Sequence, residues 1–193
     1  MKTAPLILAS ASPRRAELLK QLAPDFQVLP AHVPEVTDEF LTPFEVCQLN
    51  AHRKARAVAK KHPDALVVGA DTLVFLDHEI LGKPVDKAEA QRMLEQLQGR
   101  THQVVTGVTL MHLRTHQEKV FAVSTEVRFR ALTAEEIRQY LDKVNPLDKA
   151  GAYAIQEHGE LLVEEISGSF SNVVGLPVEQ LQMELDAWRR SIS

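Results

Sequence analysis

Residues 6–15 read LILASASPRR: an apolar run, then small hydroxyl residues, a proline and two arginines. The apolar run is typical of a short buried strand, and the small residues after it indicate a tight turn. Ser12 is a favoured N-cap residue, and Pro13 suits the first position of a helix. The stretch therefore predicts a strand, a tight turn and a helix that runs from Pro13 to about residue 22.

Two arginines, Arg14 and Arg15, fall in the first turn of that predicted helix. The N-terminal end of a helix is already electropositive, so two further cations are expected there if an anion binds. Free backbone N–H groups, the hydroxyls of Ser10 and Ser12 and the guanidinium groups together describe a phosphate cradle, with Arg14 as the first candidate. The alternative is a capped helix with two solvated arginines, and this stretch alone does not decide between them.

The composition is that of an ordinary globular protein, with 45% apolar and 25% charged residues. A length of 193 residues suits a single domain, 1–193, with one core or two small lobes. The net charge of −4 argues against nucleic acid or an anionic membrane as a partner. Cys47, the single cysteine, excludes an internal disulfide and fits a reducing cytoplasm. No stretch suits a signal peptide or a bilayer span, so a soluble, cytoplasmic protein is expected.

Strand and helix patterns mix along the rest of the chain without strict βαβ alternation, which favours a mixed α/β sheet. The capping residues Thr42, Asp86 and Thr133 mark three helix starts. Each is followed three residues later by a glutamate, at 45, 89 and 136, which predicts a capping box. The expected strands are 26–29, 66–70, 103–113, 118–129 and 161–166, with a hairpin over 72–81 that turns at Asp77 and His78. The expected helices cover 43–61, 86–98 and 133–144, and a last helix is expected to start at Pro177. Two segments are expected to be irregular, namely 148–156 and 167–175.

The apolar strand 66–70 is predicted to end in Asp71 and Thr72, and a buried carboxylate there is costly unless it is paired or bound to metal. Familiar sites are excluded: no P-loop, dinucleotide fingerprint or serine nucleophile elbow is present. His112 and His116 fall in a predicted hairpin turn, which disfavours a metal site. Cys47 lies within an apolar helix and is interpreted as core.

Polar side chains remain at the ends of several predicted elements. Oxygen ligands such as Glu35 and Asp71 suit a hard cation like Mg²⁺, which bridges carboxylates and substrate phosphates. Arginine and lysine would neutralise the remaining phosphate charge, a combination that fits hydrolysis of a phosphoanhydride. Each residue alone is weak evidence, since a single lysine is usually at the surface. The set comprises Ser10, Ser12, Arg14, Arg15, Glu35, Asp71, Thr72, Lys83, Asp148, Lys149 and Gln156.

With these blocks in order, the chain resembles the Maf family. The family signature S-x-S-P-R-R stands at 10–15, an acidic-loop glutamate at Glu35 and a helix lysine at Lys54. Further blocks are G-A-D-T at 69–72, K-P at 83–84, D-K-A-G-A-Y-x-I-Q at 148–156 and N-x-x-G-L-P at 172–177. They run from residue 6 to about 180 and so cover nearly the whole chain.

The resemblance implies a nucleoside triphosphate pyrophosphatase that needs a divalent metal, Mg²⁺ or Mn²⁺, and releases the monophosphate and pyrophosphate. It implies an elongated mixed sheet flanked by helices, with two lobes around a deep nucleotide-binding cleft, similar to inosine triphosphatases, and a homodimer in many members. The catalytic aspartate maps to Asp71, as proton acceptor for water or as metal ligand, with Glu35 as a further metal ligand. Phosphate and substrate contacts map to Ser10, Ser12, Arg14, Arg15, Lys54, Lys83, Asp148 and Lys149, and substrate choice to Arg14, Thr72 and Gln156.

Within the family, the chain resembles the branch that hydrolyses dTTP and UTP, because it has Tyr153 and Gln156. The amide of the glutamine can match the edge of a pyrimidine. This chain departs from the usual I-Q-G, because Glu157 follows Gln156. That departure concerns fine specificity rather than the reaction. Modified pyrimidine nucleotides would suit a house-cleaning role. The alternatives are a Maf enzyme with another base preference, such as 7-methyl-GTP, or a non-catalytic nucleotide-binding regulator of septum formation.

Overall fold

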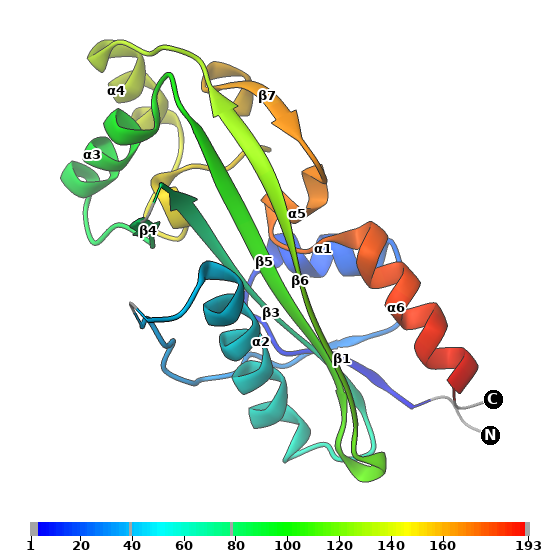
Figure 1. The fold of residues 1–193 in the computed structure, drawn as a ribbon. Helices are drawn as coiled ribbons and strands as arrows, with labels where there is room; N and C mark the ends of the chain where they lie inside the picture. The colour runs from blue at the N-terminus through cyan, green and yellow to red at the C-terminus, as the bar shows by residue number, and fades with distance from the viewer. Residues whose placement is uncertain (1–3, 39, 78, 192–193) are drawn as a thin grey trace. The chain divides into compact units, whose positions relative to one another are not determined.

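A computed structural model describes residues 4–38, 40–77 and 79–191. Within these residues, seven strands form one sheet in the order β2-β1-β3-β5-β6-β7, with β4 paired to β3 (Figure 1). β1 is parallel to β2 and β3, whereas β4 and β7 are antiparallel to β3 and β6. The strands are β1 Leu6–Leu8, β2 Gln27–Val28, β3 Leu66–Leu76, β4 Glu79–Leu81, β5 Thr101–His112, β6 Gln117–Phe129 and β7 Val163–Ser167. The expected mixed α/β sheet flanked by helices is confirmed.

The helices begin where the capping residues predict. Ser12 accepts a hydrogen bond from the backbone N–H of Arg15 at 3.4 Å, and Thr42 and Thr133 each form a complete capping box. Asp86 also caps its helix, but the Glu89 carboxylate accepts from Val85 N–H at 2.6 Å, so no full box forms there. The helices are α1 Pro13–Lys20, α2 Pro43–Ala59, α3 Lys87–Leu97, α4 Ala134–Lys143, α5 Phe170–Val174 and α6 Val178–Ser191.

The chain divides into two compact units. The first unit comprises Met1–Asp71, Thr106–Val123 and Gly175–Ser193, and the second comprises Thr72–Val105 and Ser124–Val174. Strands β3, β5 and β6 contribute residues to both units. The prediction of a single domain over 1–193 stays a prediction.

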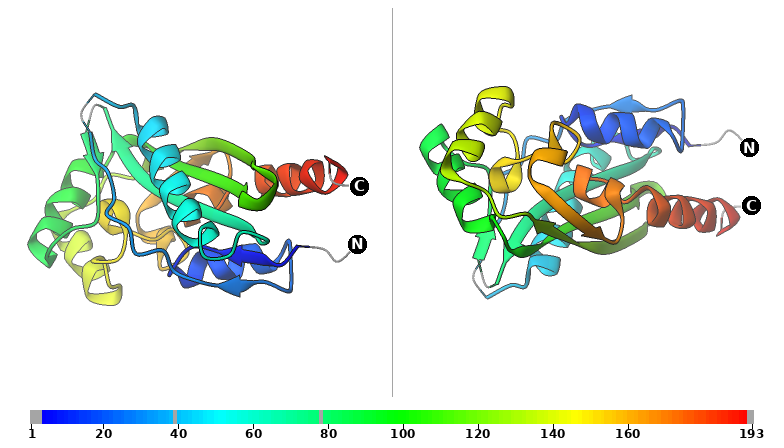
Figure 2. Two further views of the ribbon diagram at one scale, coloured as in Figure 1. Left: turned by 90° about the horizontal axis from the view of Figure 1, so that it is seen from below. Right: turned by 90° about the horizontal axis from the view of Figure 1, so that it is seen from above.

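The first unit has a sheet that is apolar on both faces. Ile7 and Val67 pack with residues of α2, whereas Leu8 and Val68 pack with Leu19 of α1 and with α6. Figure 2 shows α2 on one side of β3 and α1 on the other. Successive strand residues point to opposite faces, so the odd-numbered positions of β3 face α2. This alternation places Asp71 on the α2 face.

The second unit has its own core, in which α3 and α4 lie side by side (Figure 2). The apolar residues expected on these helices, Leu94 and Ile137 among them, are fully buried. Two 3₁₀ turns, η2 Ala150–Ala152 and η3 Gly159–Leu161, belong to this unit, and a third, η1 Leu113–Thr115, joins β5 to β6 in the first.

Three local predictions are corrected by the structure. The strand from Leu66 does not end at Asp71 but runs on to Leu76. The segment 167–175 is not all loop: α5 forms there because Ser169 Oγ accepts from the N–H of Asn172 at 3.2 Å. The strand expected from residue 161 starts at Val163, after η3. The hairpin was expected to turn at Asp77 and His78. Asp77 has a positive φ of 53°, and His78 lies outside the described residues.

Candidate active site

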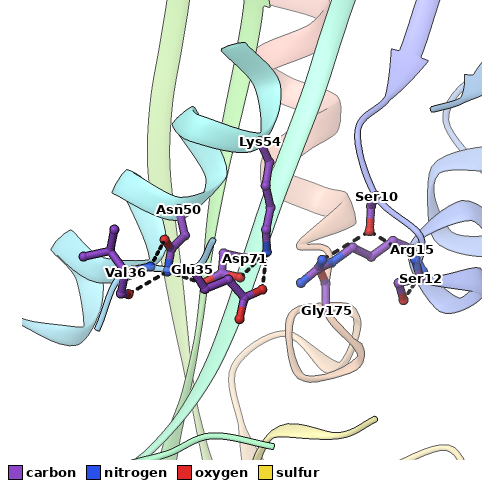
Figure 3. Close-up of polar contacts among 9 residues, drawn as sticks. All are labelled: Ser10, Ser12, Arg15, Glu35, Val36, Asn50, Lys54, Asp71 and Gly175. Atoms are coloured by element: carbon purple, nitrogen blue, oxygen red, sulfur yellow. Dashed lines mark hydrogen bonds and ion pairs between the residues drawn. The ribbon is translucent and has the colours of Figure 1, made fainter. Parts of the chain in front are cut away.

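Asp71 lies in the middle of β3 and is 4% exposed. One carboxylate oxygen accepts from Lys54 Nζ at 2.6 Å, and the other accepts from Asn50 Nδ2 at 3.2 Å (Figure 3). Both partners come from α2 and are four residues apart, so they share one face of that helix. These two donors explain why the strand can continue through a buried carboxylate.

Two glycines allow α2 to lie directly against the sheet. A Cβ atom on Gly69 of β3 would stand 2.3 Å from the carbonyl oxygen of Ala51, and one on Gly107 of β5 would stand 2.4 Å from the carbonyl carbon of Cys47. The fully buried Cys47 and Ala51 belong to the helix surface that fills this space. The close approach of backbone to backbone is what brings Lys54 within hydrogen-bond reach of Asp71.

Lys54 also joins a second carboxylate. Its ammonium group donates to Glu35 Oε1 at 2.7 Å, and the lysine side chain is 12% exposed (Figure 3). Asn50 fixes the neighbouring loop, because its amide accepts from Val36 N–H at 2.8 Å and donates to Val36 O at 3.0 Å. One ammonium therefore holds together the two carboxylates predicted as metal ligands. Asn50 is not among the residues that the sequence singles out, and its spacing of four from Lys54 is the signal that could have found it.

The turn after β1 forms a second cluster of this unit. Arg15 extends its guanidinium back over the turn, donating to the carbonyl oxygen of Gly175 at 2.8 Å and to Ser10 Oγ at 3.3 Å (Figure 3). Ser10 Oγ also accepts from the N–H of Ser12 at 3.2 Å. Burial lowers the pKa of Arg15, while the negative charges of Asp71 and Glu35 raise it. These contacts and charges tie Arg15 to the predicted residues Ser10, Asp71 and Glu35, while the choice of Arg14 as the first phosphate-binding candidate stays a prediction.

In the second unit, Lys149 is the centre of the segment 148–157. Its ammonium, 5% exposed, donates to Asn145 O at 2.7 Å and Asp148 Oδ1 at 2.9 Å, and pairs with Glu157 Oε2 at 3.2 Å. An ammonium group has three N–H donors, and these three oxygens match them. Glu157, the residue in which this chain departs from the family pattern, thus has a defined contact.

Lys83 lies close to the same segment of the second unit. The carbonyl oxygen of its neighbour Gly82 accepts from the N–H of Gly151 at 3.0 Å. Gln156 is exposed, and Thr72 is half-buried at the start of the second unit's part of β3. The structure therefore places predicted residues in three groups. The first unit holds two of them, Glu35, Lys54 and Asp71 in one and Ser10, Ser12 and Arg15 in the other. The second unit holds Lys83, Asp148, Lys149 and the segment of Gln156.

Known proteins resemble this chain over nearly its whole length. A family model for Maf-like proteins matches residues 5–188. The chain belongs to the Maf family. A relative from Akkermansia muciniphila named dTTP/UTP pyrophosphatase is 48% identical, and the match covers 92% of this chain and 93% of the relative. A relative of the same name from Carboxydothermus hydrogenoformans is 48% identical, and the match covers 95% of this chain and 98% of the relative. A third, from Symbiobacterium thermophilum, is 49% identical over 91% of this chain and 89% of its own length.

A solved HAM1 protein from Coxiella burnetii shares the fold of this Maf chain. Its TM-score is 0.51 at 15% sequence identity, and the match covers 96% of this chain and all of the other. This likeness supports the mixed α/β architecture only. Among the described residues of the Maf chain, no helix is both long and apolar enough to cross a membrane.

The donor set around Asp71 fits a hard divalent cation. Asp71 and Glu35 offer carboxylate oxygens to one common cation, which in the structure is the Lys54 ammonium. Within the described residues, no group of three or more histidine, cysteine, aspartate or glutamate side chains could form a cage. Mg²⁺ is characteristically bound by one or two carboxylates together with waters and substrate phosphates, so a pair suffices. The residues thus fit the metal that the family resemblance implies, which stays a prediction.

A buried histidine that the sequence did not single out lies beneath the segment of Gln156. His102 is 1% exposed, and burial lowers its pKa from 6.5 to about 4. Between these pH values His102 takes up a proton in the unfolded chain but not in the folded chain. The part of the folding stability that depends on neutral His102 is therefore complete above pH 6.5 and is lost as the pH falls towards 4. We expect this residue to cost the folded state about 2 to 3 kcal/mol between pH 7 and about pH 4.5.

Urea unfolding of the wild type and of His102→Gln at both pH values measures this loss. The free energy of unfolding of the wild type should fall by about 2 to 3 kcal/mol more than that of the variant, because glutamine takes up no proton. Equal pH dependence in the two proteins would show that His102 is protonated in the folded state.

Proposed function

We propose that this Maf chain is a nucleoside triphosphate pyrophosphatase that hydrolyses dTTP and UTP, and modified pyrimidine nucleotides, to the monophosphate and pyrophosphate. The observation that carries the proposal is the buried Asp71 carboxylate with its ammonium and amide partners, beside Glu35 and the Arg15 turn. The relatives that bear the name dTTP/UTP pyrophosphatase match this chain over more than nine-tenths of its length, as the resemblance to that branch predicted.

Asp71 is proposed as the residue that acts on the attacking water, either by accepting its proton or by holding the metal. Water adds to the α-phosphorus, the bond to the bridging oxygen breaks, and pyrophosphate leaves with the negative charge. A divalent metal held by Glu35 and Asp71 would supply positive charge to the phosphates. Asn50 orients the Asp71 carboxylate through its 3.2 Å hydrogen bond, and Lys54 keeps the two carboxylates close to each other.

Phosphate recognition is assigned to the cations and to the helix start. The N-terminal end of α1 and the guanidinium groups of Arg14 and Arg15 favour negative charge. The hydroxyl of Ser10 can donate to a phosphate oxygen, since its oxygen already accepts from Ser12 and Arg15. Lys83 and Lys149 are proposed to add positive charge, and Thr72 and Gln156 to contribute to substrate choice. The cytoplasm as the place of action stays a prediction from the single cysteine of the sequence, and a homodimer stays a prediction from the family resemblance.

Release of pyrophosphate from a panel of nucleotides tests this function. With Mg²⁺ or Mn²⁺, we expect kcat/KM for dTTP and UTP to exceed that for ATP and 7-methyl-GTP at least about tenfold. Preference for 7-methyl-GTP would place the chain in the other branch of the family. Tight nucleotide binding without release of pyrophosphate in a single turnover would instead support a regulator.

The same panel applied to Gln156→Ala separates base reading from catalysis. Loss of the amide should lower the preference for dTTP over the other nucleotides about tenfold and change the best turnover rate much less. Gln139→Ala, another exposed glutamine of the second unit, is the matched control. An unchanged nucleotide profile in Gln156→Ala would contradict the role of Gln156 in base recognition.

A further inference from the structure

Three aromatic rings of the second unit form a buried cluster that the proposed chemistry does not use. The ring of His102, at the start of β5, contacts Phe129 and Tyr153 edge to face, with centroids 4.9 and 5.4 Å apart. Phe129 and Tyr153 contact each other in the same way at 4.8 Å. All three side chains are buried. The cluster is therefore a rigid support on which Tyr153 has one defined place.

His102 and Tyr153 are also joined by a hydrogen bond. His102 Nε2 lies 2.7 Å from the Tyr153 hydroxyl, although 51 residues separate them. Nδ1 of His102 is buried and has no hydrogen-bond partner among the described residues. A buried imidazole with one such nitrogen costs stability relative to an apolar side chain of similar size. Its presence therefore calls for a role that a leucine or phenylalanine would not fill.

The segment that contains Tyr153 has an unfavourable backbone conformation, which other contacts must stabilise. Gly151 and Ala152 both have positive φ values, 68° and 64°, and Ala152 has a side chain that disfavours this conformation. A Cβ atom on Gly151 would lie 3.0 Å from a Val74 methyl, so the turn is packed tightly against β3. Such a conformation persists only where the surroundings fix it at several points.

Two buried hydrogen bonds supply these points. The Tyr153 hydroxyl is held by His102, and the N–H of Ala154 donates to the hydroxyl of Tyr140 at 3.1 Å. Lys149 lies four residues before Tyr153, and Gln156 three residues after it. The buried contacts thus fix the middle of a segment whose two ends carry groups assigned to the substrate.

We propose that His102 is a positioning residue for nucleotide recognition: by holding the Tyr153 hydroxyl, it keeps residues 149–156 in the arrangement that binds substrate. This inference rests on the proposed function, because it takes Lys149 and Gln156 as substrate contacts. His102 itself lies beneath the segment and acts through Tyr153. Its neutral ring offers one donor and one acceptor nitrogen, so it can pair with a hydroxyl of either orientation.

Three variants test this role. His102→Leu removes the hydrogen bond, His102→Gln places an amide near the position of Nε2, and Tyr153→Phe removes the hydroxyl. Because the reacting groups are untouched, we expect His102→Leu to raise KM for dTTP about tenfold with kcat changed less than about threefold. His102→Gln should restore most of the affinity. Tyr153→Phe should match His102→Leu, and the double variant His102→Leu/Tyr153→Phe should be no weaker than either single one, because both remove one shared contact.

Binding of a dTTP analogue with an imido group between the α- and β-phosphorus, measured by calorimetry, separates this inference from the proposed function. Wild type that binds the analogue but releases no pyrophosphate from any nucleotide would overturn the function, while the variants would still report on positioning. Binding by His102→Leu within twofold of wild type would overturn the inference. So would equal weakening in His102→Leu and His102→Gln, which indicates a purely structural role. His62→Leu, an exposed histidine of the first unit, is the control.

Discussion

Asp71→Asn is expected to lower the rate of pyrophosphate release at least about a thousandfold while the chain stays folded. Asparagine has the same shape and can still accept a hydrogen bond from Lys54, and Glu35 still pairs with that ammonium at 2.7 Å. What disappears is the negative charge that can accept a proton or hold a metal. Folding is checked by circular dichroism and thermal unfolding, and activity by steady-state release of pyrophosphate from dTTP.

Asp64→Asn is the matched control for this change. Asp64 is exposed and also pairs with a cation of the first unit, because Arg114 donates to its two oxygens at 2.7 and 2.9 Å. It lies outside the cluster of Asp71, and exposed ion pairs contribute little to stability. Asp64→Asn should therefore keep nearly full activity. Turnover by Asp71→Asn within tenfold of wild type would contradict the assignment of Asp71.

Gly107→Ala is expected to destabilise the fold by more than about 4 kcal/mol, a large part of the roughly 5 to 15 kcal/mol by which folded domains are stable. The new Cβ atom would stand 2.4 Å from the carbonyl carbon and 2.5 Å from the carbonyl oxygen of Cys47. These are backbone atoms of α2 and cannot rotate away, so the helix must move off the sheet. Since α2 carries Asn50 and Lys54, any molecules that remain folded should also lose activity.

The free energy of unfolding in urea measures this effect, with Gly82→Ala as the control. A Cβ atom on Gly82 meets nothing within 4 Å, so that substitution should change stability by less than about 1 kcal/mol. Gly69→Ala should behave like Gly107→Ala, because its Cβ would be 2.3 Å from the Ala51 carbonyl oxygen. A loss below about 1 kcal/mol in Gly107→Ala would show that α2 can shift outward at little cost.

Helix starts and buried helix faces could be predicted from the sequence because they depend on neighbours in the chain. The Thr42–Glu45 and Thr133–Glu136 boxes are hydrogen bonds across three residues, and the structure contains both. The short helix α5 was missed, since Ser169 caps it inside a segment that reads as a polar loop. The predicted end of the strand at Asp71 was wrong for another reason, because the partners that stabilise this carboxylate lie 17 and 21 residues away.

The sequence by itself determined the element types, the mixed α/β class and the family, because these depend on local hydrogen bonds, on side-chain periodicity and on ordered motifs. Only the tertiary structure decided that Asn50 and Lys54 meet Asp71, that Arg15 turns to Ser10 and Gly175, and that Glu157 pairs with Lys149. It also decided that His102 meets Tyr153. The contacts of Asp71 depend on how closely α2 approaches the sheet. That distance is set by Gly69 and Gly107, whose missing side chains have a consequence only when two distant backbones come together.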